Sequence, residues 1–179
     1  MVGSPVCSCL PKGSKEFFLH LNRLEILDLS YNRLSGELPL SLPSSNIRTV
    51  DLSSNHFFGA IPSSFFQQAS NLTSFNVSNN TFTGGNLAPG LGKCSKLQVF
   101  HAGHNNLSRL LLEDIYNATK LEEIALPLNS LHGAISDKIV NLTNLAILDL
   151  SFNHFGREFP LNLGKLSKLK LVTLDFNNL

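Results

Sequence analysis

The chain has 179 residues, 42% of them hydrophobic and 15% charged, a composition that can build a continuous core and excludes a disordered polar chain. The formal net charge is +1, and the one local basic cluster, Lys165, Lys168 and Lys170, is too sparse for a nucleic-acid-binding surface. Every apolar run is shorter than the roughly 18 residues that a membrane-spanning helix needs.

Residues 1–18 are expected to form an irregular N-terminal tail. They show no basic start followed by a long apolar segment, so no signal peptide is recognised. Cys7 and Cys9 form a C-x-C pair that rarely bonds to itself, and together with Cys94 they leave at least one cysteine unpaired. None of the three has the spacing of a zinc or redox site, and their pairing stays open.

Residues 19–179 contain one pattern seven times, L-x-x-L-x-L-x-x-N-x-L or a close variant, and the last copy ends in a truncated repeat. The pattern asparagines follow one another at intervals of 23 to 25 residues: Asn32, Asn55, Asn80, Asn105, Asn129, Asn153 and Asn177. Each Leu-x-Leu pair, such as Leu27 and Leu29, alternates with the period of a strand. The pattern therefore predicts one short strand per repeat, stacked in parallel, with the rest of each unit closing a shared apolar core.

The pattern asparagines are expected to form a structural ladder. An inward amide has two donors and an acceptor, so it can satisfy backbone groups left unpaired where a strand turns outward. Replacing one by leucine should cost about 1–3 kcal/mol.

The segments 36–39 and 59–62 read G-x-[LI]-P, in which glycine permits the turn and proline stiffens the return. With this motif the chain resembles the plant-specific class of leucine-rich repeat. The resemblance implies a horseshoe-shaped α/β solenoid, with a parallel concave sheet, a second shorter sheet, and 3-10 turns and short helices on the convex side. Departures put the convex regularity in doubt at these positions: Gly85, Asn86, Leu87, Arg109, Leu112, Ser136 and Arg157.

The segments GLGKCSKLQVF and NLGKLSKLKLVTLDFNNL are similar in sequence to repeats of plant receptor-like kinases for tyrosine-sulfated glycopeptides and phytosulfokine. That resemblance implies the extracellular part of a plasma-membrane receptor, which binds a peptide ligand and signals with a co-receptor kinase. Intact members carry a signal peptide, a membrane helix and a kinase domain that are not recognised here, so membrane attachment would come only from other regions. The last repeat stops at Leu179, and we expect an uncapped end that exposes an apolar cross-section.

Motifs for catalysis, cofactors and metals give no site. GLGK at 90–93 departs twice from a phosphate loop, at Leu87 and Cys94, and kinase and nucleophile-elbow signatures are not found. His101 and His104 lie on neighbouring surface positions, but they lack a third metal ligand. We therefore expect neither an enzyme nor a cofactor.

N-x-[ST] glycosylation motifs occur at six positions: Asn71, Asn76, Asn79, Asn106, Asn117 and Asn141. Either they arise by composition in an Asn- and Ser-rich repeat, or the protein passes through the secretory pathway. Strand alternation directs Asn76 to the concave sheet, where a glycan would obstruct a ligand. Asn117 and Asn141, on returning segments, are expected to be the better acceptors.

Strand alternation also predicts two columns of concave residues. The middle column runs Asp28, Asp51, Asn76, His101, Ala125, Asp149 and Thr173, and the flanking column runs Tyr31, Ser54, Asn79, His104, Leu128, Phe152 and Phe176. From them, His101, His104, Leu128, Asp149, Phe152 and Phe176 are the candidate ligand-binding residues. Packing of the apolar members against the loop edge remains an alternative, and a sulfated ligand would find only the two histidines as basic groups.

The leading hypothesis is a noncatalytic peptide-recognition module from a receptor-like kinase. Three alternatives stay open: a kinase-lacking receptor-like protein, a secreted leucine-rich-repeat inhibitor, and a nonfunctional truncated product. The sequence does not identify the ligand.

Overall fold

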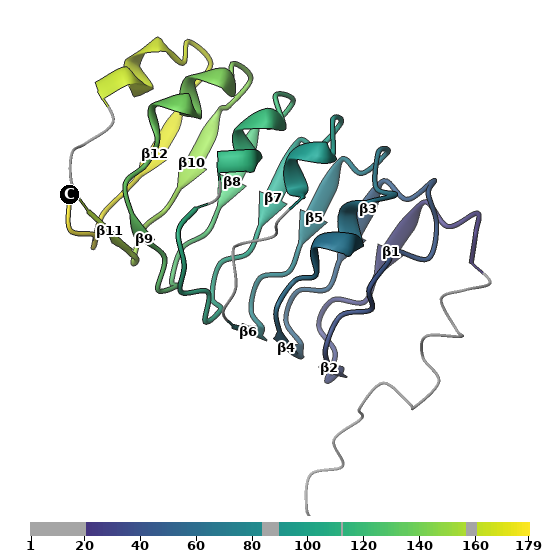
Figure 1. Cartoon of the computed structure of the whole chain (residues 1–179). Coiled ribbons are helices and arrows are strands. Elements are labelled where there is room, and N and C mark those ends of the chain that lie inside the picture. Colours follow the sequence, from purple (N-terminus) through teal and green to yellow (C-terminus); the bar gives the residue numbers. More distant parts are fainter. Residues whose placement is uncertain (1–20, 84–89, 112, 157–160) are drawn as a thin grey trace, which may run out of the picture.

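The computed structural model describes residues 21–83, 90–111, 113–156 and 161–179. Cys7, Cys9 and the departures at Gly85, Asn86, Leu87, Leu112 and Arg157 lie outside these ranges. The described chain is a solenoid whose repeats stack in one row, with a long sheet along one side and a row of short helices along another (Figure 1).

The long sheet holds one three-residue strand from each repeat, all parallel and in chain order. Its strands are β1 (Ile26–Asp28), β3 (Thr49–Asp51), β5 (Ser74–Asn76), β7 (Val99–His101), β8 (Glu123–Ala125), β10 (Ile147–Asp149) and β12 (Leu171–Thr173). The register is constant, so that Asp28 pairs with Asp51 and Asp149 pairs with Thr173. The predicted strand in every repeat is thus confirmed, and equivalent residues lie in straight columns.

A second, shorter sheet follows the pattern asparagines along the lower edge in Figure 1. One part contains β2 (Ser35–Gly36), β4 (His56–Gly59) and β6 (Thr81–Phe82), and the other contains β9 (His132–Gly133) and β11 (His154–Phe155). Between the two parts, within the described ranges, only isolated bridges occur, Thr83 with Asn106 and Leu110 with His132. This gap includes Arg109, which replaces the motif glycine, as the expected loss of regularity suggested.

The returning segments form 3-10 helices, and no α-helix occurs in the described ranges. They are η1 (Ser63–Phe66), η2 (Leu91–Lys93), η3 (Glu113–Asn117), η4 (Asp137–Asn141) and η5 (Leu161–Lys165). Each packs on the next, and Gly92 shows how closely: a β-carbon there would lie 2.0 Å from the carbonyl oxygen of Asp114 in η3.

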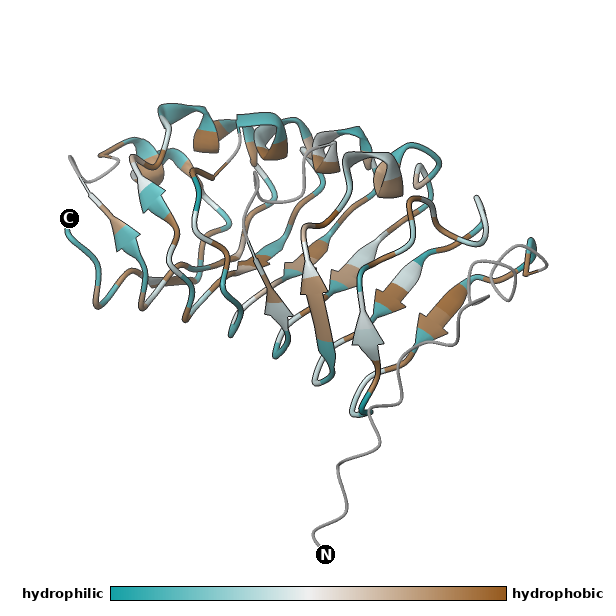
Figure 2. Ribbon diagram, turned by 60° about the horizontal axis from the view of Figure 1, so that its bottom comes forward, coloured by the Kyte–Doolittle hydropathy of each residue, from teal (hydrophilic) through white to brown (hydrophobic). Residues whose placement is uncertain are grey.

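The core lies between the long sheet and the 3-10 helices and takes apolar residues from every repeat. Figure 2 shows hydrophobic residues recurring along the strands and helices of successive repeats. The central strand residue is buried in repeats 2 to 6, as with Val50, Phe75 and Ile124. Phe75 stacks on Phe100 with ring centroids 6.0 Å apart, and Phe66 meets Phe75 edge to face at 5.2 Å. Burial of this whole apolar cluster, to which the rings belong, is the main stabilising contribution.

The amides of the pattern asparagines link successive repeats. In repeat 6, Asn153 Nδ2 donates to the carbonyls of Leu126 (2.9 Å) and Leu150 (3.1 Å), while its Oδ1 accepts from the Leu131 amide at 3.0 Å. The same geometry recurs at Asn55, Asn80, Asn105, Asn129 and Asn177. Asn32 in repeat 1 differs, because its Nδ2 donates to Leu29 and Ser30 of its own repeat.

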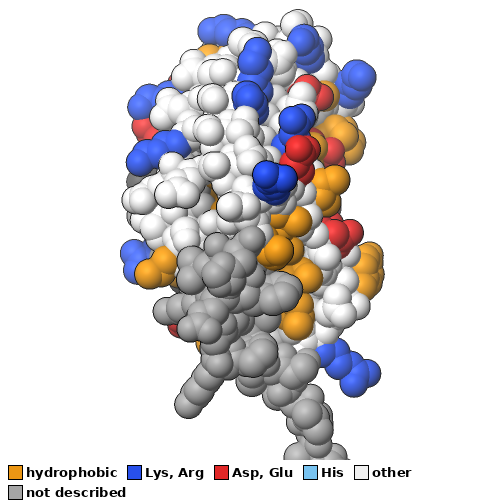
Figure 3. All heavy atoms as spheres, turned by 90° about the vertical axis from the view of Figure 1, so that its right-hand side faces the viewer, with side chains coloured by type: hydrophobic (Ala, Val, Ile, Leu, Met, Phe, Trp, Pro, Cys, Tyr) orange, Lys and Arg blue, Asp and Glu red, His pale blue; other side chains and the backbone are white. Residues whose placement is uncertain are grey.

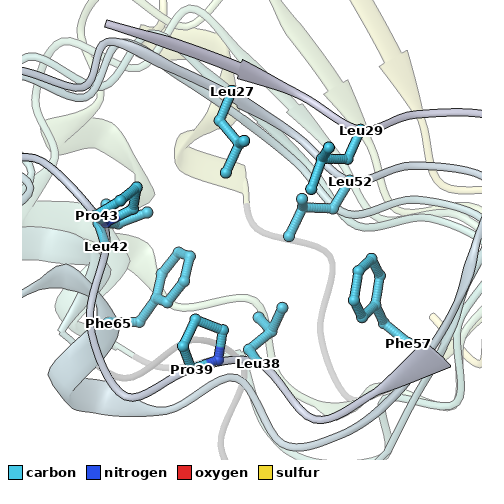
Figure 4. Close-up of a pocket in the computed structure, with 9 residues that line it drawn as sticks. All are labelled: Leu27, Leu29, Leu38, Pro39, Leu42, Pro43, Leu52, Phe57 and Phe65. Atoms are coloured by element: carbon cyan, nitrogen blue, oxygen red, sulfur yellow. The ribbon is translucent and has the colours of Figure 1, made fainter. Parts of the chain in front are cut away.

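The core opens at the first repeat as a hollow lined entirely by apolar side chains from repeats 1 and 2 (Figure 4). Leu27, Leu38 and Phe65 face one another across it. Seen from this end of the solenoid, hydrophobic side chains are exposed beside charged ones (Figure 3). A wall without polar atoms cannot orient a ligand by hydrogen bonds, so this hollow is not the candidate site. Among the described residues there is no helix long and apolar enough to cross a membrane.

Candidate ligand-recognition surface

The concave face is formed by five positions in each repeat: the residue before each strand, its two outward residues, and the two residues that precede the pattern asparagine. Constant register places these positions in five columns. The predicted middle column is the last residue of each strand. Its members in repeats 2 to 7, from Asp51 to Thr173, are partly exposed. The central residue of each strand points to the other side, and in repeats 2 to 6 it is buried.

The flanking column has an unusual backbone. All seven residues, from Tyr31 to Phe176, lie in the left-handed region with φ between 51° and 55°. Only Asn79 and His104 are of types enriched in this conformation, and bulky apolar residues there are strained. Backbone hydrogen bonds between repeats stabilise this strained conformation. The backbone amide of the flanking residue donates to the next repeat, as Phe152 N does to the Asp175 carbonyl at 2.9 Å. The turn projects each side chain from the end of its strand.

Three large apolar side chains follow one another in this column, and we call Leu128, Phe152 and Phe176 the aromatic column. Leu128 and Phe152 are each 41% exposed and Phe176 is 71% exposed. The two phenylalanine rings stack with centroids 4.2 Å apart and planes 12° from parallel. They form a flat apolar surface that faces solvent, a composition typical of interface anchors.

The aspartates of the middle column have a structural task that sequence reasoning missed. Asp149 Oδ1 accepts from the Ser151 amide at 3.0 Å and from its hydroxyl at 2.7 Å, and Asp28 holds Ser30 with the same two distances. The hydrogen bonds from the Ser30 side chain and backbone lower the pKa of Asp28. The recurring D-L-S tripeptide was the available signal, because Asp and Ser two residues apart form such turns. The turn uses one carboxylate oxygen of Asp149 and leaves the other available.

The two candidate histidines occupy different environments. His101 Nε2 lies 3.0 Å from Glu123 Oε1, so a protonated His101 forms an ion pair with the neighbouring strand. His104, at the left-handed position, is exposed. In the described ranges no group of three or more His, Cys, Asp or Glu side chains is placed to hold a metal ion.

Repeats 4 and 5 replace the D-L-S turn with His101-Ala-Gly103 and Ala125-Leu-Pro127. Gly103 is required here, because an added β-carbon would lie 2.8 Å from Pro127 Cδ.

The six glycosylation motifs lie on different faces. Asn76 Nδ2, the atom a glycan would occupy, donates to Asp51 Oδ2 at 3.0 Å, and Asn71 Nδ2 donates to the Ser45 carbonyl at 3.0 Å. Asn79 is exposed on the concave flank, and Asn106 is exposed beside the second sheet. Asn117 and Asn141 are exposed at the ends of η3 and η4, away from the concave face.

The buried thiol of Cys94 is not a nucleophile. Cys94 is fully buried at the end of η2, and burial, with a smaller contribution from the charge of Asp114, raises the pKa of its thiol to about 12. The thiolate is therefore scarce at neutral pH.

One strand per repeat, an asparagine ladder and a continuous open sheet define a leucine-rich-repeat domain. The Leucine Rich Repeat family model matches residues 23–45, 46–67, 71–94 and 144–166, about half of the chain. The chain belongs to the leucine-rich-repeat family.

Its relatives are plant receptors. Over 119 residues the chain is 35% identical to Receptor-like protein 41 of Arabidopsis thaliana, a match that covers 66% of this chain and 14% of the relative. Over 169 residues it is 36% identical to Receptor-like protein 18 of the same plant, covering 90% and 19%. Phytosulfokine receptor 1 of Arabidopsis thaliana is 36% identical over 125 residues, covering 56% and 12%. The chain thus spans less than a fifth of the length of these relatives.

Solved structures agree with this placement. The complex PEPR1–AtPEP1 superposes with a TM-score of 0.83 at 33% identity, covering 88% of this chain and 22% of the other. The Arabidopsis receptor kinase HAESA, in complex with the peptide hormone IDA and the co-receptor SERK1, superposes with a TM-score of 0.83 at 30% identity, covering 90% and 26%. The expected solenoid and the likeness to plant leucine-rich-repeat receptor ectodomains are confirmed.

Proposed function

We propose that this chain is part of the extracellular region of a plant cell-surface receptor and that it recognises a peptide ligand on its concave face, noncatalytically. The observation that carries the proposal is the aromatic column, in which the exposed rings of Phe152 and Phe176 stack on each other and Leu128 continues the apolar surface, none of the three belonging to the core cluster. The relatives that are receptors, and the neighbours solved with peptide hormones, support it. In this proposal a co-receptor kinase joins the complex, as SERK1 does in the complex of HAESA with its peptide hormone.

A kinase-lacking receptor-like protein is the second candidate, favoured by the similarity to Receptor-like proteins 41 and 18. Both candidates use the same recognition surface. They differ in regions beyond this chain.

The recognition role is tested by selecting random displayed peptides on the purified chain and on two variants. The double variant Phe152→Ala/Phe176→Ala removes the stacked rings, and Leu161→Ala removes an 87% exposed leucine of η5 as a matched control. We expect peptides enriched on the wild type to be retained by the control and lost by the double variant. Enrichment that is equal on all three proteins, or no enrichment, would contradict the proposal.

The assignment of the glycosylation sites is tested by secreting the chain behind a heterologous leader and mapping its glycans by mass spectrometry. We expect occupancy at Asn117 and Asn141, which are exposed on the outer side. Glycan at Asn76 would break the hydrogen bond to Asp51 and obstruct the concave face. A fully occupied Asn76 beside empty Asn117 and Asn141 would refute this assignment.

A further inference from the structure

The concave face is acidic although the chain as a whole is not. Its five columns hold seven carboxylates: Glu25, Asp28, Asp51, Glu122, Glu123, Asp149 and Asp175. Against these stand two cations, Arg48 and Lys170, which gives a formal charge of −5 with histidine neutral, whereas the complete sequence has +1. The charges are thus segregated, and most lysines lie on other faces.

The two concave cations do not alter the surroundings of the aromatic column. Arg48 Nε is 3.3 Å from Glu25 Oε2 and belongs to the opposite end of the sheet. Lys170 precedes β12, while Phe176 follows that strand, so the two lie at opposite ends of the concave face in repeat 7.

Carboxylates border the aromatic column directly. Asp149 is three residues before Phe152, and its register partners are Ala125 and Thr173, so no large side chain flanks it in the middle column. Asp175 is exposed and adjoins Phe176. Because the Ser151 turn uses Oδ1 of Asp149, a cation beside the aromatic column would meet the other carboxylate oxygen without breaking that turn.

The histidines do not turn this region into an anion site. His101, the basic group of the middle column, is already within 3.0 Å of Glu123. An anionic ligand group that approached His101 would also approach Glu123 and be repelled.

From the exposed rings together with this charge complementarity, we infer that the ligand is a cationic peptide segment in which an apolar or aromatic side chain packs on Phe152 and Phe176, and a neighbouring Lys or Arg pairs with Asp149 and Asp175. The inference rests on the proposed function and specifies its ligand class. It disfavours a sulfated tyrosine at these repeats.

The test uses fluorescence anisotropy of labelled, acetylated and amidated Gly/Ser peptides titrated with the complete chain. One peptide carries one Phe and two Lys; in three others the Lys residues are replaced by Glu, the Phe by Ala, or the Phe by sulfotyrosine. We expect the Phe/Lys peptide to bind most tightly, and its affinity to fall when salt is raised from about 0.05 to about 0.5 M.

Asp149→Asn and Asp28→Asn are a matched pair of variants, since both aspartates hold a serine with identical distances but lie at opposite ends of the sheet. The fold tolerates an amide here, because Asn76 accepts from the Ser78 backbone in the same way at 3.1 Å. Asp149→Asn and Asp175→Asn should each weaken binding of the Phe/Lys peptide about two- to fivefold, and Asp28→Asn should leave it unchanged.

Tighter binding of the Glu peptide, or equal effects of Asp149→Asn and Asp28→Asn, would overturn the cationic assignment. Tighter binding of the sulfotyrosine peptide, which keeps both Lys residues, would overturn the choice of an unmodified aromatic side chain. If binding of the Glu peptide were lost in Phe176→Ala, concave peptide recognition would still stand. If none of the four peptides bound, the cationic assignment would fall, and the display selection would decide the proposed function separately.

Discussion

Asn153→Leu is expected to destabilise the solenoid far more than Asn32→Leu, although both remove the same pattern residue. Asn153 is 3% exposed and satisfies the Leu126 carbonyl and the Leu131 amide of the preceding repeat. Leucine of similar size leaves the buried Leu131 amide unpaired and removes one of the two hydrogen bonds to the Leu126 carbonyl, to which Asn129 Nδ2 still donates at 3.2 Å. The expected loss is therefore about 1–3 kcal/mol.

Asn32 provides the control, because it is exposed and its side-chain amide donates within its own repeat, so its replacement should cost less than about 1 kcal/mol. Urea unfolding followed by circular dichroism gives both values, provided that the m-values stay equal. Equal losses for the two variants, or a loss below about 0.5 kcal/mol for Asn153→Leu, would refute the inter-repeat account of the ladder.

Three further predictions concern packing, reactivity and strain. Gly92→Ala should destabilise the protein by more than about 2 kcal/mol in the same urea assay, because its β-carbon would meet the Asp114 carbonyl at 2.0 Å. Gly164 stands in the same Leu-Gly-Lys context with nothing within 4 Å, so Gly164→Ala should be neutral. A neutral Gly92→Ala would contradict the η2–η3 packing. Since burial raises the thiol pKa of Cys94 to about 12, its alkylation at about pH 8, followed by peptide mass spectrometry, should be slow in the native protein and fast in urea, and fast native alkylation would show the thiol to be accessible. Leu128→Gly removes a side chain from a left-handed residue (φ 54°) and should raise the unfolding midpoint by relieving about 1–2 kcal/mol of strain. An unchanged or lower midpoint would contradict this, because the packing of Leu128 would then be worth at least as much as the strain.

Much of the fold could be predicted from the sequence because each repeat has the same pattern of leucines and asparagine. The Leu-x-Leu alternation determines which strand residues are buried, and the spacing of the asparagines determines the register, so the columns of the concave face were predictable from the residues alone. The break in the second sheet near Arg109 was signalled by the lost glycine.

Other features depend on contacts between repeats that a one-dimensional pattern does not contain. The left-handed backbone at Leu128 and Phe152 contradicts their own preferences and exists because neighbouring turns impose it. Likewise, Asp149 was expected to serve a ligand, but the structure shows one of its oxygens committed to Ser151. The pairing of His101 with Glu123, which decides the charge at that place, arises from two different strands.

The most direct test of the central claim is to map where a displayed peptide, once selected and given a photoactivatable group, crosslinks to the chain. Recognition on the concave face predicts adducts at Leu128, Phe152, Phe176 and the ends of β8, β10 and β12. Adducts concentrated on η1 to η5, or in the apolar hollow around Leu27, Leu38 and Phe65, would contradict it.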